Sequence, residues 1–415
     1  MASTPQLTDS WTLGALHVPN RVLLAPLAGI GNWFVRLQAK RHGAGMAVSE
    51  MVSSHAIHYR NERTLRELLL IHPEERTAGA RGPTSIQLFG QDPEIMRSAA
   101  ASAVAAGADA IDINMGCPVP KVCKTGSGAA LLSNPALAVA VARAAVDGAA
   151  EGRAALARAT EERLAVDHAA EGVAGVDGGA DERVVVDSSA EGPAARARVG
   201  ARPRGGVSDW TPDTAPRFAG PVPVTVKLRS GQRPGDTSGF ELAQRLVHDA
   251  GVAAIAFHPR SAAVHHKGVP DYELAARLVA VLPAPVILTG GLHDAASVRA
   301  AFAQTGAAAV MLARGALGNP WLFEQLVGDR NAGPSRAEVV AELQWTMTRA
   351  VEHLGAERAV RYLRKFYPWY VARLGLDRTQ IVALQESLQN AENLAQVRRL
   401  LDDLLATAAP PALAA

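Results

Sequence analysis

Short apolar runs alternate with longer Ala- and Leu-rich stretches through most of this 415-residue chain, and this rhythm limits the folds open to it. Eight such runs are present, at residues 21–26, 45–50, 84–90, 110–116, 222–229, 252–258, 284–290 and 307–313. Apolar runs of this length between helical stretches are typical of βα units, whose strands lie parallel in one sheet. A count of eight favours a closed (β/α)8 barrel, the TIM-barrel fold, over an open sheet.

One segment, residues 148–219, breaks this rhythm between the fourth and fifth runs. A Val-Asp-x-x-Ala-Glu-Gly motif begins at Val146, Val166 and Val186, which is a period of twenty residues. Residues 148–209 contain no Phe, Tyr or Trp and mix acidic with basic side chains, so the segment has little to bury. We therefore expect a flexible, low-complexity insertion rather than a small folded repeat module.

The strand pattern ends near residue 330. Residues 331–408 carry an apolar periodicity suited to several helices. We expect residues 1–330 to form the barrel, residues 331–408 to form an all-helical domain that recognises the substrate, and residues 409–415 to form a disordered tail. The helical part includes a basic, aromatic-rich stretch, residues 357–378, with six Lys or Arg against two Asp or Glu.

Composition and the N-terminus indicate the compartment. Two cysteines give no disulfide framework, and the first residues lack the basic and apolar regions of a signal peptide. No uncharged apolar run reaches the ~18 to 20 residues that cross a bilayer, and a net charge of +2 excludes a protein that is basic throughout. We expect a cytoplasmic monomer without a membrane partner. We also expect no metal, because no second Cys or His stands at a zinc-like spacing from Cys117.

Polar, glycine and proline residues gather where the predicted strands end, which is where the reacting groups of (β/α)8 enzymes lie. They are Pro26, Gly29, Gln87, Asn114, Cys117, Lys227, Arg229, His258, Arg260, Gly290, Gly291, Arg314 and Gly315. A glycine pair after the seventh strand and a glycine loop after the eighth form the usual phosphate site of this fold. We expect a ligand with a terminal phosphate, such as flavin mononucleotide (FMN), although both segments could also be plain tight turns.

Two side chains stand out within this set. Lys227 interrupts an apolar strand, and burying an unpaired ammonium is costly, so we expect it to face the electron-rich edge of a reduced flavin. A lysine that reaches solvent at the strand end is the alternative. Cys117 lies between Gly116 and Pro118 in a loop, which favours a presented thiol over a small buried hydrophobic residue. We interpret Cys123 as incidental.

Seven segments, in order along the chain, together resemble the bacterial, FMN-dependent tRNA-dihydrouridine synthase family. They are APLAG, QLFG, DINMGCPVPKV with GSGAALL, VTVKLR, FHPRSA, TGGL and MLARGALGNPW, and the resemblance continues into RYLRKFYPWY of the helical part. It implies an enzyme that reduces particular uridines of tRNA to 5,6-dihydrouridine, with NADPH reducing the flavin. The chain departs from the family pattern at the insertion, at Thr289–Gly291 and in the loop after Arg260.

The resemblance also implies roles for single residues. Cys117 is the implied catalytic proton donor. The implied flavin-binding residues are Pro26, Leu27, Ala28, Gln87, Lys227, His258, Thr289, Gly290, Gly291, Ala313 and Arg314. Asn114 and Arg260 are the residues implied at the target uridine.

The charge of residues 357–378 adds a further expectation. Arg361, Arg364 and Lys365 belong to this stretch, and their charges suit contact with tRNA phosphates. The alternative is that the aromatic residues of the stretch pack against the barrel while its arginines lie in solvent.

Two other functions stay open on the sequence alone. A dihydroorotate-dehydrogenase-like flavin barrel also acts at the 5,6 bond of a pyrimidine, but it has no need of a basic helical domain. A catalytically inactive barrel kept for RNA binding would have no need of Cys117, Lys227 and His258 together.

Overall fold

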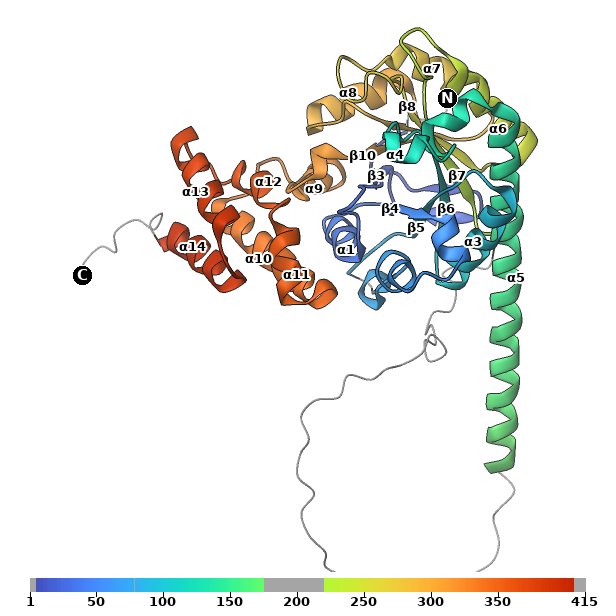
Figure 1. Ribbon diagram of the computed structural model, residues 1–415, viewed down its shortest axis with the longest axis horizontal. Coiled ribbons are helices and arrows are strands. Elements are labelled where there is room, and N and C mark those ends of the chain that lie inside the picture. Colours follow the sequence, from blue (N-terminus) through green and yellow to red (C-terminus); the bar gives the residue numbers. More distant parts are fainter. Residues whose placement is uncertain (1–4, 78, 175–219, 407–415) are drawn as a thin grey trace, which may run out of the picture.

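Eight parallel strands close into a barrel in this computed structural model, which describes residues 5–77, 79–174 and 220–406 (Figure 1). The strand order is β10-β3-β4-β5-β6-β7-β8-β9. The strands are β3 (Val22–Leu24), β4 (Met46–Ser53), β5 (Thr84–Phe89), β6 (Ala110–Met115), β7 (Val224–Arg229), β8 (Ala254–His258), β9 (Val286–Thr289) and β10 (Ala309–Leu312). Each predicted strand is present, with ends that move by at most three residues, so the expected barrel is confirmed.

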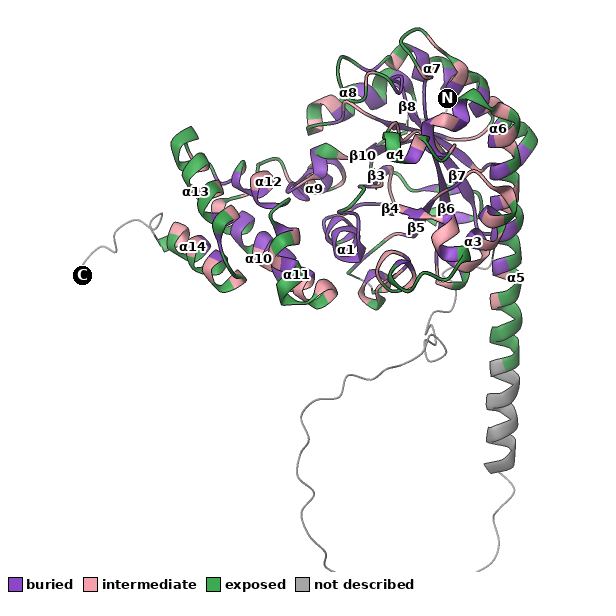
Figure 2. Ribbon diagram, viewed as in Figure 1, coloured by how far each residue is buried: buried purple, intermediate pink, exposed green. Residues whose placement is uncertain are grey.

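Successive strand residues face the barrel interior and the surrounding helices in turn. On β3, Leu23 belongs to the interior cluster, whereas Val22 and Leu24 belong to the outer core. Because both faces are buried, the strands are rich in apolar residues, as is usual for parallel sheets covered by helices. Figure 2 shows this arrangement, with buried strands and helices whose outer faces are exposed.

An N-terminal hairpin closes the barrel at the end where the strands begin. β1 (Trp11–Leu13) pairs antiparallel with β2 (Leu16–Val18). The hairpin side chains pack in the same cluster as Met46, Ala110 and Ala254, which open their strands. No sequence pattern predicts this hairpin, because two strands of three residues are too short for an alternating pattern to stand out.

Helices of three kinds surround or extend the barrel. The outer ring consists of α1 (Trp33–Arg41), α3 (Pro93–Ala105), α5 (Pro135–Ala174), α6 (Ser238–Ala250), α7 (Tyr272–Val281), α8 (Ala295–Thr305) and α9 (Trp321–Val327). Short helices in the loops are α2 (Ser54–His58), η1 (Thr64–Leu68), η2 (Pro73–Arg76), α4 (Pro120–Cys123), η3 (Gly128–Ser133) and η5 (Arg314–Ala316). The C-terminal helices are α10 (Arg336–Leu354), α11 (Ala356–Leu363), α12 (Tyr367–Val371), α13 (Arg378–Asn390) and α14 (Leu394–Ala406), and they cluster beside α1 and α9 (Figure 1). Among the described helices, none combines the length and the apolar character that a membrane span requires.

The prediction of a flexible insertion is wrong for residues 148–174, which continue α5. Gly148 and Gly152, one turn apart, lie against α3. A Cβ on Gly148 would overlap the carbonyl oxygen of Arg97, and one on Gly152 would lie 2.6 Å from that of Ala101. The first repeat copy therefore belongs to the packing of the barrel, because alanines favour a helix and glycines let two helices approach closely. The rest of the predicted insertion, residues 175–219, and the predicted tail lie outside the described residues.

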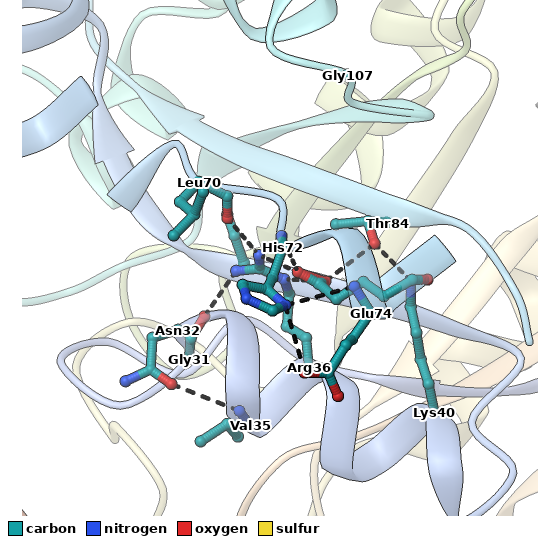
Figure 3. A network of polar contacts seen from close by, with 12 residues as sticks. Gly31, Asn32, Val35, Arg36, Lys40, Leu70, His72, Glu74, Thr84 and Gly107 are labelled. Carbon is teal, nitrogen blue, oxygen red and sulfur yellow. Dashed lines mark hydrogen bonds and ion pairs between the residues drawn. The ribbon is translucent and has the colours of Figure 1, made fainter. Parts of the chain in front are cut away.

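A buried ion pair ties α1 to the chain that leads into β5 (Figure 3). The Arg36 and Glu75 side chains are 1% and 0% exposed, with Nη2 and Oε1 2.7 Å apart. Arg36 also donates to the carbonyl oxygens of Gly31 (3.3 Å) and Leu70 (2.7 Å). Burial alone would raise the pKa of the Glu75 carboxyl, but the charges of Arg36 and Lys40 hold it below its ordinary value. The network fixes the start of α1, directly after the loop that follows β3.

Candidate active site

The loops at the C-terminal ends of the strands enclose a cavity of about 350 Å³, which is within the range of small-molecule sites. The residues predicted at the flavin, the uridine and the catalytic position all line it: Pro26, Leu27, Ala28, Gln87, Asn114, Cys117, Lys227, His258, Arg260, Thr289, Gly290, Gly291, Ala313 and Arg314. Arg361, Arg364 and Lys365 do not line it. Met51, His265, His266 and His293 also contribute to the wall, and no sequence pattern pointed to them.

The cavity wall is strongly basic. Lys227, Arg229, Arg260 and Arg314 line it, and within the described part of the chain no Asp or Glu does. The Arg314 guanidinium and the Lys227 ammonium form no hydrogen bond or ion pair with any described residue. The Nε of Arg260 is buried and likewise has no partner among the described residues. Unpaired cations on a concave wall suit an anionic ligand, because burying them uncompensated is costly.

Burial shapes the protonation of two further groups on the wall. It lowers the pKa of Lys227 to about 8, with Arg229 adding to the effect and Asp112 opposing it. It also holds the pKa of His258 well below its ordinary value, aided by Lys227, Arg229 and Arg260, so this imidazole is neutral at pH 7. Arg260 Nη1 lies 3.3 Å from His258 Nε2. Because a guanidinium can only donate, the His258 proton is on Nδ1.

Two glycines after β9 form the part of the wall expected at a phosphate. Gly290 and Gly291 have φ values of 98° and 79°. A Cβ on Gly290 would overlap the His258 ring, and one on Gly291 would lie 2.5 Å from Tyr272 Oη. Only glycine fits both positions, and both residues line the cavity together with Arg314, so backbone and guanidinium can meet an anionic group there. These observations fit a ligand with a phosphate, such as FMN.

Cys117 lies on the cavity wall in a loop that is held from several sides. Its backbone N–H donates to Asn114 Oδ1 at 2.9 Å, and Arg229 Nε donates to the Gly116 carbonyl oxygen at 2.9 Å. The Cys123 thiol donates to the Cys117 carbonyl oxygen at 3.2 Å, so Cys123 supports the loop weakly. Burial raises the pKa of the Cys117 thiol above its ordinary value. The thiol is therefore protonated at neutral pH, and the backbone that carries it is held in place.

Asn114 lines the cavity, but its amide is already bonded within the protein. Its Nδ2 donates to Gln87 Oε1 at 3.0 Å, and its Oδ1 accepts from the backbone N–H groups of Gly116 and Cys117. The geometry therefore connects Asn114 to the position of Cys117. Its predicted contact with the target uridine stays a prediction.

The basic, aromatic-rich stretch of the helical part has two faces. Tyr367 and Tyr370 are each 1% exposed, and Gln38 of α1 donates to Tyr370 Oη at 2.8 Å. Arg358 forms a pair of hydrogen bonds with Glu67 at 2.8 and 2.9 Å. The aromatic residues thus pack inward, as in the alternative reading of this stretch.

Three cations of the same stretch are on the outer face. Arg361, Arg364 and Lys365 are exposed. Lys365 Nζ donates to the carbonyl oxygen of Gly29 at 3.2 Å, in the loop that follows β3 and lines the cavity. Exposed positive charge therefore lies close to the barrel mouth.

Comparison with known proteins gives the family. The model of the dihydrouridine synthase (Dus) family matches residues 23–151 and 215–406, and the gap between them lies in the predicted insertion. Probable tRNA-dihydrouridine synthase 1 of Synechocystis sp. is 30% identical over 405 residues, covering 95% of this chain and 89% of the relative. tRNA-dihydrouridine synthase B of Pseudomonas aeruginosa is 31% identical over 369 residues, 87% of each protein. The protein of that name from Shewanella oneidensis is 28% identical over 399 residues, 95% of this chain and 99% of the relative. The chain therefore belongs to the dihydrouridine synthase family.

Proposed function

We propose that this protein reduces specific uridines of tRNA to 5,6-dihydrouridine, with FMN as cofactor and NADPH as the reductant that reloads it. The observation that carries the proposal is a protonated thiol, Cys117, on the wall of a basic cavity. Membership of the family, whose curated relatives are named tRNA-dihydrouridine synthases, supports it. It also favours this function over a dihydroorotate-dehydrogenase-like activity and over an inactive RNA-binding barrel.

We assign a different role in this reaction to each group of cavity residues. Gly290, Gly291 and Arg314 would hold the phosphate of FMN, and Lys227 would face the edge of its ring. The chemistry that bound FMN supplies is hydride transfer to carbon 6 of uracil. Cys117 then donates its proton to carbon 5, where negative charge has developed, and a thiol that is protonated at pH 7 can do this. A uridine in folded tRNA must leave its stack to reach this cavity.

Mapping of tRNA modifications tests the proposal directly. Mass spectrometry of tRNA from cells that lack the protein should show uridine where the parent strain has dihydrouridine, and the wild-type gene should restore the modification. The purified protein with FMN and NADPH should modify the same position in an unmodified transcript. Unchanged tRNA in the deleted strain, together with no product from the purified protein, would refute the proposal.

Gly290→Ala is expected to weaken FMN binding by at least about tenfold. The new Cβ would overlap the His258 ring, and a φ of 98° is strained for alanine, so the phosphate wall must shift. Quenching of flavin fluorescence on titration of the flavin-free protein measures the affinity. Gly235→Ala is the matched control, because Gly235 has a φ of 81° with no atom within 4 Å of its added Cβ. Equal FMN affinities in the two variants would contradict a role of Gly290 in phosphate binding.

Charge reversal on the helical part is expected to weaken tRNA binding. A plot of log K against log salt has a negative slope. If Arg361 and Arg364 each contact a phosphate, the double Arg→Glu variant should make this slope shallower, by about 2. Filter binding at several salt concentrations measures this slope. Arg143→Glu with Arg158→Glu, two exposed arginines on α5, is the control for net charge. A slope that becomes shallower by the same amount in both double variants would argue against a specific contact at the helical part.

A further inference from the structure

A buried carboxylate lies beneath the cavity, and the chemistry described above does not use it. Asp112 on β6 is 1% exposed and does not line the cavity. In the sheet its register partners are Gln87 on β5 and Thr225 on β7. It is therefore one layer below Asn114, whose register partner is Lys227.

Both oxygens of Asp112 accept hydrogen bonds from its register partners. Gln87 Nε2 donates to Oδ2 at 2.6 Å, and Thr225 Oγ1 donates to Oδ1 at 2.5 Å. An ionised carboxylate can only accept, so it dictates which way the Gln87 amide points. The amide nitrogen faces down to Asp112, and the amide oxygen is left to face Asn114.

The same polarity continues to the catalytic loop. Gln87 Oε1 accepts from Asn114 Nδ2 at 3.0 Å, so Asn114 must present its oxygen on the other side. That oxygen accepts from the N–H groups of Gly116 (3.2 Å) and Cys117 (2.9 Å). An acceptor-only carboxylate at one end and backbone N–H groups that can only donate at the other thus fix the direction of every bond in a chain that ends at the backbone of Cys117.

Asp112 also acts on the charge of the cavity floor. The charged group that faces it is Lys227 of β7, while its contacts from β5 and β7, Gln87 and Thr225, are neutral. Lys227 in turn faces Arg229 and Cys117. The negative charge of Asp112 raises the pKa of Lys227 and so opposes the effect of burial.

We propose that Asp112 is a positioning residue of this active site, whose carboxylate orients the Gln87 and Asn114 amides and, through them, the thiol of Cys117. The inference rests on the proposed function, since it assigns Asp112 to the proton delivery by Cys117. It goes further in naming the group that holds the proton donor in place.

The titration of Asp112 gives the proposal a signature. Burial raises the pKa of its carboxyl to about 6, with Thr225, Gln87 and Lys227 opposing the shift. Below that pH the protonated group can donate as well as accept, so it no longer requires the Gln87 amide nitrogen to face it and holds this amide less firmly. The kcat of uridine reduction should therefore fall as the pH drops through about 6. It should also fall as the pH rises through about 8, where Lys227 loses its charge.

Asp112→Asn and Thr225→Val are expected to change this pH profile in different ways. Asp112→Asn should lower kcat at pH 7 by about 10- to 100-fold with little change in KM, because a small misplacement of a reacting group is costly. Its acidic limb should disappear, and its alkaline limb should move to lower pH. Thr225→Val keeps the carboxylate but removes a bond that lowers its pKa, so its acidic limb should move to higher pH. Limbs that stay at the wild-type pH in both variants would overturn the proposal.

Alkylation of Cys117 provides a readout that needs neither tRNA nor turnover. In a Cys123→Ala background, iodoacetamide can react with Cys117 alone. Asp112→Asn and Asn114→Ala should both increase the alkylation rate severalfold. In the protein with Asp112 intact, the alkylation rate divided by the thiolate fraction of Cys117 should rise as the pH falls through about 6. Unchanged rates in both variants would contradict the proposal even if dihydrouridine forms. If the wild type makes no dihydrouridine, the proposed function fails, and the alkylation result still decides the role of Asp112.

Discussion

Cys117→Ala is expected to lower the rate of uridine reduction by about 10²- to 10⁴-fold, the range that general acid catalysis supplies. The wall that would hold FMN remains intact, because the backbone bonds of the loop do not involve the thiol. Flavin absorbance of the purified variant should therefore match the wild type, and NADPH should still reduce the flavin. Quantitative mass spectrometry of dihydrouridine in a tRNA transcript measures the loss.

Cys123→Ala is the matched control for this experiment. Its thiol is the other one in the chain and contributes one weak hydrogen bond to the Cys117 carbonyl oxygen. We expect turnover to stay within about threefold of the wild type, because a bond of this kind contributes little. Turnover by Cys117→Ala at the wild-type rate would exclude Cys117 as the proton donor, whatever the control shows.

Arg36→Met is expected to lower the free energy of unfolding by about 3–5 kcal/mol, the typical effect of removing one member of a buried ion pair. Glu75 is fully buried, and methionine cannot replace the two hydrogen bonds from Arg36. Chemical denaturation followed by tryptophan fluorescence, with the melting temperature as a second probe, measures the change. Since the pKa of Glu75 is held below 4.5 in the folded protein, the loss should be full above that pH and shrink as the pH falls below it.

Arg358→Met is the control for an exposed pair. Arg358 bonds Glu67 with two hydrogen bonds of similar length, but much of the pair is in solvent. We expect a change within about 1 kcal/mol, because surface ion pairs are worth little. Equal losses in Arg36→Met and Arg358→Met would show that burial does not set the strength of these pairs.

The strands and most of the cavity wall could be predicted from local sequence. Each strand is a short apolar run, and residues such as Gln87, Lys227 and Gly290 follow directly from where those runs end. In a barrel of parallel strands, all C-terminal ends meet on one side, so a list of strand ends is also a list of neighbours. This geometric rule is why residues as far apart in the chain as Pro26 and Arg314 could be assigned to one site.

Other features depend on contacts that leave no local pattern. In the sequence, Gly148 and Gly152 lie in a low-complexity repeat, yet in the structure α5 contacts α3 at both glycines. The tyrosines of residues 357–378 belong to a basic stretch expected to contact tRNA, yet Tyr367 and Tyr370 pack inward. In both cases the composition indicated a structural propensity of the segment, but not which residues it packs against in the folded protein.

Periodicity and strand-end chemistry were sufficient for the barrel, the end at which its site lies and the place of Cys117 on the cavity wall, because these follow from interactions between residues close in the chain and from one rule of closure. The folded molecule was needed for the direction of the hydrogen bonds from Asp112 to Cys117, for the pairing of Arg36 with Glu75 and for the inward face of the helical part. Burial and hydrogen-bond direction depend on groups that distant segments bring within about 3 Å of one another, and spacing along the chain does not encode that proximity.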